Sequence, residues 1–472
     1  MLTSPVKRPG SDAPPKPMTV PSSRPLPRVV LSVRRRSRHP WIYRKMCRPA
    51  NLAPGTLVEV VDRDGAFVGR GIYNRKSEIA IRLLSEDPSR PLDRSFFDEA
   101  LDRAVRYRRE VLALDRITDA YRVVNSEGDG LSGLVVDRLG GFAVVQLFSA
   151  GWFRLLGWLL EAVSRQLGGA TVLVRAGEAA ERREGFRVRD FAAAKLGKER
   201  LGTIVQEGGI RFRVDLESGQ KTGFFCDQRE NRLAVRELAR GKRVLDGFSY
   251  TGGFALNASL GGALSVTGVD LDEKAVALAK ENAALNGLAA EFIHGDVFDF
   301  LRSRASAGTR YDLVILDPPK FASGRAELER ALRRYRDLNA LACRVLEPRG
   351  LLVTSSCSGA VSEARFRQAA YAGARRAGVR LELLSSRGAA ADHPLRPEFP
   401  EGRYLKVLTL RAEPGRARGI TRPSALPPAP PSPPPSPSSS PVPPSGRRAS
   451  PLSGAPSSAS GTSSDAASSS CR

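Results

Sequence analysis

Two apolar runs, Tyr311-Asp-Leu-Val-Ile-Leu-Asp-Pro-Pro-Lys-Phe321 and Gly350-Leu-Leu-Val-Thr-Ser-Ser-Cys-Ser-Gly359, place a carboxylate and then a thiol at their ends. Each run is short, rich in apolar and β-branched residues and bounded by Gly or Pro, which predicts a buried parallel strand. The residues between them have the length and character of a crossover helix. Asp317 and Cys357 should therefore lie side by side at the carboxyl edge of an open α/β sheet, where ligands bind in such folds.

The sequence before these runs alternates between strand and helix patterns from Arg229 onward. Strands are predicted at 243–245, 265–269 and 291–293. Helices are predicted at 253–260 and at 273–286, where Asp272 is a good N-cap and Asn286-Gly287 a good stop. Strands alternating with helices of this length predict a doubly wound parallel sheet.

The N-terminal half divides into two further regions. Residues 57–73 predict a β-hairpin around Asp64-Gly65, within a small all-β module. A connecting helix over 92–114 leads to a middle α+β unit with two strands between 121 and 148, a helix over 152–167 and strands at 171–175 and 204–214. We expect domains at 29–92, 93–215 and 216–412, between a disordered extension, 1–28, and a disordered Pro/Ser-rich tail, 413–472.

Charge and cysteine usage restrict the class of protein. Each tail contributes +4 to the net charge of +24, which leaves +16 for the middle of the chain and favours a polyanionic partner, although a basic surface could also serve solubility. The five cysteines show no CxxC spacing, so neither a zinc site nor a disulfide scaffold is indicated, and no metal is expected. No segment reaches the length of a membrane span or has the apolar core of a secretory signal, so we expect a cytoplasmic protein.

The run Val244–Ala255 predicts a strand, a turn of small residues and a helix start. Gly252 and Gly253 would let the backbone approach a ligand closely. The run lacks GxGxxG, and the chain lacks a phosphate loop, so an adenosyl ligand without phosphates, S-adenosylmethionine, fits better than a dinucleotide or a triphosphate. Three successive strands end near acidic residues, of which a single one would more often be a helix cap. The expected cofactor residues are Gln228, Asp246, Phe248, Ser249, Thr251, Gly252, Gly253, Asp270, Asp296 and Asp317.

Seven motifs in order resemble the ribosomal RNA large subunit methyltransferase I family. They are Arg36-Ser-Arg-His-Pro-Trp41, Ser126-Glu-Gly-Asp-Gly-Leu131, Lys221-Thr-Gly-Phe-Phe-Cys-Asp-Gln-Arg229, Phe248-Ser-Tyr-Thr-Gly-Gly-Phe254, Asp317-Pro-Pro-Lys-Phe321, Ser356-Cys-Ser-Gly359 and Ala391-Asp-His-Pro394. The resemblance covers roughly residues 29–412. It implies a PUA-like module, a middle α+β domain and a Rossmann-like class I methyltransferase domain that makes 5-methylcytosine in 23S rRNA with S-adenosylmethionine.

This family's chemistry needs a thiolate that adds to C6 of the base, because C5 of cytosine is a poor nucleophile. We expect Cys357 to be that nucleophile, Lys320 to favour its thiolate, and Asp317 to hold N3 and the exocyclic amine of the base. Many RNA cytosine-C5 methyltransferases carry a second cysteine after the Pro of this motif. This chain reads Pro318-Pro319-Lys320 there and lacks that cysteine, and the resembled family lacks it too. The proton-abstracting base is unassigned: Asp392 or His393 could approach the site, or Asp392 could stabilise a turn.

Other residues are assigned to packing, cofactor closure or RNA. Cys226 and Cys343 are expected to pack in the core, and Cys471 lies in the tail. The resemblance places Gln228 and Arg229 in an element that closes over the methyl donor, and 221–225 would either join this lid or form a loop with no binding role. The expected RNA contacts are Arg34, Arg35, Arg36, Arg38 and Trp41. Trp41 could instead fill the core of the small module.

Several rival functions are compatible with parts of this pattern. A 5-methyluridine or guanine RNA methyltransferase would share the fold, but methylation of an amine needs no nucleophilic cysteine. An RNA-binding assembly scaffold would share the basic surface, although the acidic strand ends argue for an active cofactor site. A small-molecule methyltransferase is disfavoured by the charge. The partner is expected to be 23S rRNA, free or partly assembled, with no membrane, and a homodimer is left open.

Overall fold

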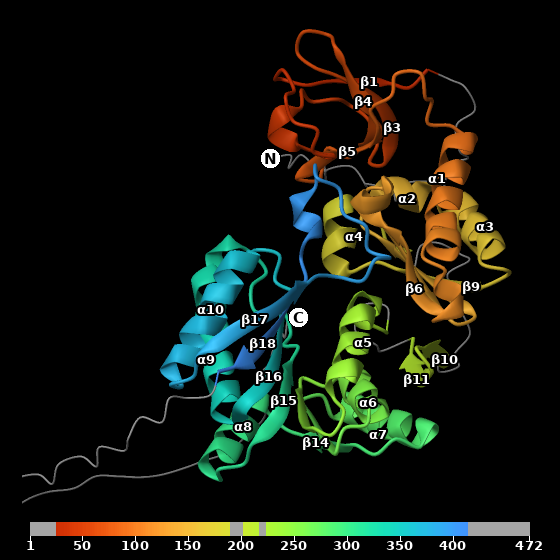
Figure 1. Ribbon diagram of the computed structural model, residues 1–472. Helices are drawn as coiled ribbons and strands as arrows, with labels where there is room; N and C mark the ends of the chain where they lie inside the picture. The colour runs from red at the N-terminus through yellow and green to blue at the C-terminus, as the bar shows by residue number, and fades with distance from the viewer. Residues whose placement is uncertain (1–24, 189–201, 217–222, 414–472) are drawn as a thin grey trace, which may run out of the picture. The chain divides into compact units, whose positions relative to one another are not determined.

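A computed structural model describes residues 25–188, 202–216 and 223–413, and the predictions for most of both tails, for Lys221 and Thr222 and for Cys471 lie outside them. Within these ranges the strands form sheets of five, four, two and seven strands (Figure 1). No helix in these three ranges is long and apolar enough to cross a membrane.

The five-stranded sheet forms the N-terminal module. Its strands are ordered β1 (Arg28–Val30), β3 (Thr56–Val61), β4 (Phe67–Tyr73), β5 (Ile79–Ser85) and β2 (Trp41–Tyr43). The predicted hairpin is confirmed: β3 and β4 pair antiparallel, Gly65 takes φ 86° in the turn, and Asp62 Oδ1 accepts hydrogen bonds from the backbone N–H groups of Asp64 and Ala66. A glycine suits this left-handed turn position because it has no Cβ.

The four-stranded sheet, in the order β6 (Ala120–Asn125), β7 (Leu134–Leu139), β8 (Phe142–Leu147) and β9 (Thr171–Arg175), forms the middle unit. Helix α1 (Arg94–Arg106), capped by Asp93, packs on it with α2 (Ala150–Arg154) and α3 (Leu156–Gln166), and α4 (Glu178–Glu184) follows β9. Two predictions were wrong here. Three strands, not two, occupy 120–147, because Gly140 takes φ 60° in a tight turn between β7 and β8, and the helix over 152–167 is two helices that meet at Leu155.

A hairpin of β10 (Gly202–Glu207) and β11 (Ile210–Asp215) forms the two-stranded sheet. The sequence places it in the middle unit, yet its apolar side chains lie in the same buried cluster as those of the seven-stranded sheet. The backbone N–H of Arg213 donates to Asn282 of α7 (Glu273–Asn286) at 2.7 Å, and buried Glu207 pairs with Arg232 of α5 (Arg229–Leu238) at 2.7 Å. The hairpin also bonds to the middle unit, where Asp119 Oδ1 accepts the backbone N–H of Gln206 at 2.7 Å, so it connects the middle unit with the C-terminal unit.

The seven-stranded sheet confirms the doubly wound prediction. Its order is β14 (Glu291–His294), β13 (Ser265–Asp270), β12 (Arg243–Gly247), β15 (Tyr311–Leu316), β16 (Leu346–Ser356), β18 (Lys406–Ala412) and β17 (Leu381–Arg387). The first five are parallel to one another, and β18 runs antiparallel to both of its neighbours, β16 and β17, so that β17 has the same direction as the first five. The order reverses between β12 and β15, which is the switch point where such sheets bind ligands.

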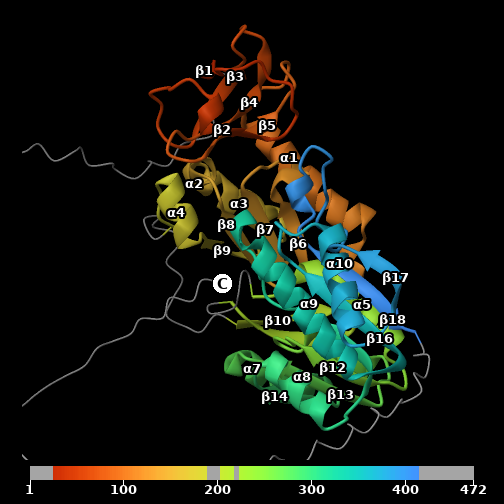
Figure 2. The same ribbon diagram turned by 90° about the vertical axis from the view of Figure 1, so that its left-hand side faces the viewer.

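Helices cover both faces of this sheet. One face packs against α5, α6 (Gly253–Leu260) and α7, and the other against α8 (Val297–Ser306), α9 (Leu328–Arg344) and α10 (Glu363–Arg376), which Figure 2 shows from the side of α9. The predicted ends of α7 are confirmed. Asp272 accepts hydrogen bonds from two backbone N–H groups of the first turn, and Gly287 closes the helix with φ 60°.

Candidate active site

The ends of β15 and β16 bring Asp317 and Cys357 together, as the sequence predicts. The two strands pair in parallel, with Leu316 opposite Thr354, so both residues follow neighbouring strands at the carboxyl edge. The Sγ of Cys357 lies 4.0 Å from the carbonyl oxygen of Pro318. A carboxylate and a thiol thus share one corner of the sheet.

Cys357 differs from the other described cysteines in its surroundings. Cys226 and Cys343 are buried, as expected; burial raises the pKa of Cys226 well above its ordinary value and that of Cys343 to about 12. Burial also raises the pKa of Cys47 to about 11. Cys357 is only half-buried. The three thiols that stay protonated are poor nucleophiles, whereas Cys357 is at the edge where ligands bind.

A buried hydroxyl cluster holds the backbone around Cys357. Ser356 Oγ donates to the hydroxyl of Tyr335, which lies 3.1 Å from Ser358 Oγ. Ser358 Oγ in turn accepts hydrogen bonds from the backbone N–H groups of Phe321 and Ala322, at 3.1 and 3.2 Å. These bonds connect the segment that carries Cys357 to the loop that carries Asp317. Buried side chains therefore fix the position of the Cys357 thiol relative to the Asp317 carboxylate.

The cation against this segment is Lys406, which the sequence analysis missed. Lys406 lies opposite Ser356 in the pairing of β16 and β18, is 2% exposed, and donates from Nζ to the carbonyl oxygens of Ser358 and Tyr404 at 2.8 and 2.7 Å. Burial lowers its pKa to about 8, and the charge of Cys357 acts to raise it. Lys320, the expected cation, is exposed and has no hydrogen bond or ion pair within the described ranges. A lysine at the start of the apolar run 405–410 was the available signal.

Gln228 reaches the same corner from the segment that precedes α5. Its Nε2 donates to Asp317 Oδ2 at 2.9 Å, and its Oε1 accepts from Asn231 Nδ2 at 2.7 Å. Gln228 is 4% exposed, so this chain of bonds is shielded from water. Gln228 therefore lies close to the site, and its contact with the catalytic corner is the hydrogen bond to Asp317.

Arg229 and Asp392 form a buried ion pair on the far side of the same element. Arg229 Nη2 lies 2.7 Å from Asp392 Oδ1, and Asp392 Oδ2 accepts the backbone N–H of Arg122 at 2.8 Å. Although burial alone would raise the pKa of Asp392, the charges of His393 and Arg229 hold it well below its usual range. Asp392 thus anchors its segment to Arg229 and to the backbone of β6, and a carboxylate whose pKa is held so low is a weak base.

The loop after β12 has the strained backbone typical of a ligand cradle. Phe248 and Tyr250 take positive φ values of 67° and 47°, and Gly252 takes 88°. Asp246 is fully buried: its Oδ2 accepts the backbone N–H of Ala255 at 2.9 Å, and burial raises its pKa well above the ordinary value. Non-glycine residues at positive φ persist only where the surrounding structure holds them, and they cluster at functional sites.

The two glycines of this loop serve packing rather than open access. A Cβ on Gly252 would lie 3.0 Å from the ring of Phe292, and a Cβ on Gly253 would lie 3.0 Å from Cδ of Arg232. Gly252 also needs its positive φ, which a residue with a side chain rarely adopts. The structure thus gives a different reason for these glycines from the close ligand approach that the sequence suggests.

The acidic strand ends have unequal roles. Asp270 Oδ2 accepts the backbone N–H of Tyr250 at 2.8 Å, so this carboxylate holds the strained loop in place. Asp296 caps α8 by accepting the backbone N–H of Asp299 at 3.0 Å and is exposed. Asp270 therefore organises the cradle, whereas Asp296 has the helix-cap role that a single such residue usually has.

The cradle has the donors and acceptors that an adenosyl ligand requires. Two buried polar atoms of the cradle, Asp246 Oδ1 and Ser249 Oγ, have no hydrogen-bond partner among the described residues. Thr251 is also buried, at 6% exposure. Unsatisfied buried groups of this kind call for a ligand or water. The residues therefore fit S-adenosylmethionine at the switch point between β12 and β15.

The basic segment of the N-terminal module is divided between structural and exposed residues. Arg35 donates to the carbonyl oxygens of Ser37 and His39, and burial lowers its pKa despite the opposing charge of Glu86. Arg34 pairs with Asp64 at 2.6 Å. Arg36 and Arg38 are exposed, the latter 3.5 Å from Glu86. Arg35 thus stabilises its own loop, and Arg36 and Arg38 are the more accessible of the four arginines.

Trp41 joins the N-terminal module to two later segments. Its Nε1 donates to Glu127 Oε1 at 2.7 Å, and its ring packs edge-to-face against Phe399 with centroids 4.9 Å apart. Glu127, in the Ser126-Glu-Gly-Asp motif, is buried and also accepts from Ser132 Oγ. Trp41 therefore lies outside the core of its own sheet, and its indole N–H is occupied by the protein.

Comparison with known proteins assigns the family. An S-adenosylmethionine-dependent methyltransferase model matches residues 128–372, and a PUA-like domain model matches residues 32–86. Ribosomal RNA large subunit methyltransferase I of Klebsiella pneumoniae (strain 342) is 36% identical over 396 residues, which cover 82% of this chain and 98% of that protein. The chain belongs to the ribosomal RNA large subunit methyltransferase I family. The protein of the same name from Escherichia coli O157:H7 is 36% identical over 382 residues, 79% of this chain and 95% of the relative.

Two solved structures support the fold assigned to this family member. SMU.776, a methyltransferase crystallised with SAH, has a TM-score of 0.67 at 23% identity and covers 79% of this chain and 96% of its own. A SAM-dependent methyltransferase from Streptococcus mutans has a TM-score of 0.67 at 22% identity, covering 82% and 100%. The resemblance seen in the sequence is confirmed, and the chain is an S-adenosylmethionine-dependent methyltransferase with a PUA-like domain and a Rossmann-like domain.

Proposed function

We propose that the chain methylates C5 of a cytosine in 23S rRNA, with Cys357 as the nucleophile. One observation carries the proposal: a half-buried thiol and a carboxylate follow neighbouring strands at the ligand-binding edge, with Cys357 Sγ 4.0 Å from Pro318 O. The relatives, ribosomal RNA large subunit methyltransferases I, indicate large-subunit RNA as the substrate. Amine methylation would leave the placement of this thiol without a purpose.

The chemistry uses the thiol and the carboxylate in sequence. The thiolate of Cys357 forms a bond to C6 of the base, which makes C5 electron-rich, while Asp317 holds N3 and the exocyclic amine. S-adenosylmethionine, when bound, supplies an electrophilic methyl group. C5 then carries both a hydrogen and a methyl group. Loss of that proton to a base and cleavage of the S–C6 bond restore the aromatic ring and release the thiolate.

We assign support of the thiolate to Lys406. Its ammonium is fixed by two carbonyl oxygens, those of Ser358 and Tyr404, which flank the segment that carries Cys357. A buried cation held beside a thiol favours the thiolate, because a positive charge in a poorly solvated site acts with little screening. Lys320 is exposed and would be screened by water.

RNA presentation falls to the regions outside the catalytic unit. We propose the division 29–92, 93–215 and 216–412 for the working domains, with the hairpin β10–β11 packed on the last of them. Arg36 and Arg38 are exposed and could bind phosphates, which position RNA without reading its sequence. A base within folded RNA must be unstacked before it reaches Cys357, at a cost of a few kcal/mol.

Trapping with modified RNA tests the reaction directly. RNA that carries 5-fluorocytidine at the target position cannot lose a proton from C5, so the Cys357–C6 bond persists and a protein–RNA adduct is retained on a denaturing gel. Wild-type enzyme with S-adenosylmethionine should form the adduct, and Cys357→Ala should not, although its affinity for S-adenosylmethionine stays nearly unchanged. Cys47→Ala, a cysteine in the N-terminal module, is the matched control and should form it normally.

Two outcomes would redirect the proposal. An adduct with 5-fluorouridine RNA alone would make uracil the target base. Full methylation by Cys357→Ala would remove the covalent route altogether. Bisulfite sequencing of rRNA from cells with and without the gene then identifies the position, because one cytosine signal should be lost.

A further inference from the structure

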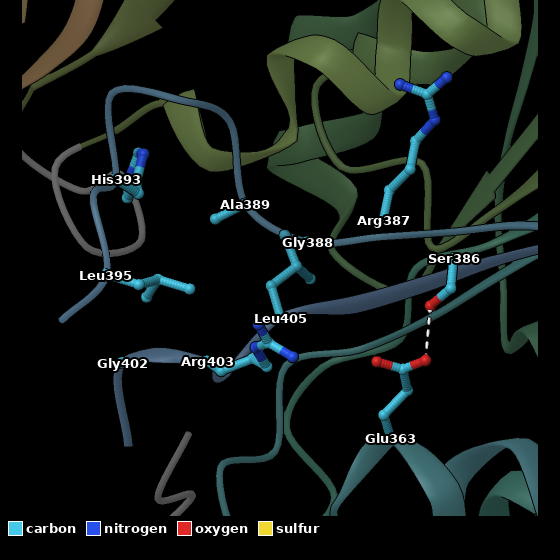
Figure 3. A pocket seen from close by; sticks show the side chains of 10 residues that line it. All are labelled: Glu363, Ser386, Arg387, Gly388, Ala389, His393, Leu395, Gly402, Arg403 and Leu405. Carbon is cyan, nitrogen blue, oxygen red and sulfur yellow. Dashed lines mark hydrogen bonds between the residues drawn. The ribbon is translucent and has the colours of Figure 1, made fainter. Parts of the chain in front are cut away.

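A hollow of about 290 Å³ lies at the same edge of the seven-stranded sheet as Cys357. Its walls come from the end of β17, the segment before β18, and the start of α10, and include Arg387, Leu395, Arg403 and Leu405 (Figure 3). The volume is just below the range for small-ligand sites, about 300 to 1,000 Å³. It suits one nucleotide rather than a longer segment.

Strands β18 and β17 place this hollow beside Cys357. Ser356, the residue before Cys357, pairs with Lys406 of β18, and Val407 of β18 pairs with Arg387 of β17. Neighbouring strands are about 5 Å apart, so the hollow begins one to two strand spacings from Cys357. The cofactor cradle is on the other side, after β12 and β13. A polynucleotide whose target base reaches Cys357 must therefore pass over β18 and β17 or leave the sheet.

The charges of the hollow suit a phosphate chain. Arg387 and Arg403 are exposed, and the guanidinium of neither has a hydrogen bond or ion pair to any described residue. The acid of the hollow, Glu363, accepts a hydrogen bond from Ser386 Oγ at 2.8 Å. Figure 3 shows Arg403 beside Leu405, whereas the guanidinium of Arg387 extends away from them. The two cations are thus placed to meet different phosphates of one strand rather than to grip a single anion.

The apolar part of the hollow suits the face of a base. Leu395 is 47% exposed, one of few large apolar side chains of the described chain that are so open. It lines the hollow with Leu405, which is buried. A base removed from its stack in RNA loses apolar contact that a protein surface must replace. The hollow therefore offers an open leucine for a base, and arginines at two separate places for the adjoining phosphates.

We infer that this hollow holds the RNA nucleotide next to the target base, with its base against Leu395 and Leu405 and the adjoining phosphates at Arg403 and Arg387. The inference rests on the proposed function, because it takes single-stranded RNA as the substrate at Cys357. It makes the sheet edge a two-nucleotide platform, with the reacting base over β16 and its neighbour over β18 and β17. The preference for sequence next to the target would then be set here.

Substitutions at the exposed positions test the inference. Arg403→Ala and Arg387→Ala should each raise KM for RNA about tenfold, with kcat and the affinity for S-adenosylmethionine unchanged. Arg375→Ala is the matched control, because Arg375 is exposed in the last turn of α10, at the opposite end of that helix from Glu363. The control should leave KM within about twofold. An unchanged KM in both hollow variants would overturn the inference.

An abasic substrate separates base packing from phosphate binding. Leu395→Ala should lower kcat/KM about fivefold on normal RNA. Two further RNAs lack the base on the 5′ side or on the 3′ side of the target. On the one that lacks the base held by the hollow, Leu395→Ala and wild type should have the same kcat/KM. An equal loss on both abasic RNAs would contradict a base at Leu395. Direct measurement of RNA affinity for the same substitutions, each combined with Cys357→Ala, tests the hollow without the reaction. If the covalent mechanism is wrong, these affinities still test the hollow. If the hollow does not bind RNA, the adduct with 5-fluorocytidine RNA should still form.

Discussion

The two halves of the carboxyl edge are built differently. Over β13 and β12, backbone N–H groups hold the carboxylates: Asp270 accepts from Tyr250 and Asp246 accepts from Ala255. Over β16, β18 and β17, polar side chains and carbonyl oxygens dominate, with the ammonium of Lys406 bound to two carbonyls and Arg387 and Arg403 exposed. The first half is a rigid cradle for a constant cofactor. The second presents charge to a substrate that must arrive and leave.

Asp317 lies where the two halves meet, and its loss should cause the largest effect. Asp317→Ala removes the carboxylate that Gln228 binds at 2.9 Å and that we assign to the target base. We expect kcat to fall by about 10³-fold, within the range of about 10²–10⁴ for a positioned acid–base group. Single-turnover methylation of RNA measures it. Gln228→Ala, which leaves Asp317 in place, should lose far less; an equal loss would mean that Asp317 acts mainly through Gln228.

Substitutions of Lys406 test whether the half of the edge over β16, β18 and β17 controls the thiolate of Cys357. Lys406→Met should lower kcat about 10- to 100-fold at neutral pH, because the thiolate loses its buried cation. In the wild type, activity should fall as pH rises through about 8, where the pKa of Lys406 lies. Lys406→Arg, which stays charged at these pH values, should move that fall to higher pH. An unchanged high-pH limb in Lys406→Arg would assign it to another group.

Deprotonation of Lys406 should change stability with pH in the opposite direction from activity. Burial lowers its pKa to about 8 from 10.5, so between these values the unfolded chain binds the proton and the folded chain does not. Stability should therefore rise with pH across this window, while activity falls. Urea denaturation of wild type and Lys406→Met at pH 8 and pH 10 checks the sign. The variant should lack the increase that wild type shows; a parallel increase in both would contradict the assignment.

Asp270 and Asp296 test the rigidity of the cofactor half. Asp270→Ala releases the backbone N–H of Tyr250, so the strained loop should loosen and affinity for S-adenosylmethionine should fall about tenfold. Asp296→Ala removes only a helix cap and should change that affinity less than twofold. Calorimetric titration with S-adenosylmethionine compares them. Equal losses would place Asp296 against the cofactor, as the sequence alone suggested.

The smallest expected effect lies outside both halves. Trp41→Phe removes the hydrogen bond to buried Glu127, which retains Ser132 Oγ as a partner, so the free energy of unfolding should fall by about 1 kcal/mol. The midpoint of urea denaturation measures it. Tyr43→Phe, at an exposed position of the same strand, is the control and should be neutral. A large loss of RNA affinity in Trp41→Phe without loss of stability would instead support direct contact with RNA.

Local sequence patterns predicted much of the fold and part of the site. The ends of α7 follow from Asp272 and Gly287, whose effects are confined to neighbouring residues. Asp317 and Cys357 were placed together because adjacent parallel strands end at one edge. The extra strand between residues 120 and 147 was missed because a two-residue Gly turn leaves little trace in the apolar pattern. Long-range pairings, such as Arg229 with Asp392, have no local signature.

By itself the sequence determined the family, the cofactor and the corner that holds a thiol beside a carboxylate, because each rests on motifs or on periodicity within one strand–helix unit. Only the tertiary structure decided which cation lies beside Cys357 and where a neighbouring nucleotide could lie. Those residues follow Cys357 by 30 to 50 positions and lie near it because β17 ends, and the antiparallel strand β18 begins, at the same edge. Such proximity depends on strand order, which pattern along the chain does not specify.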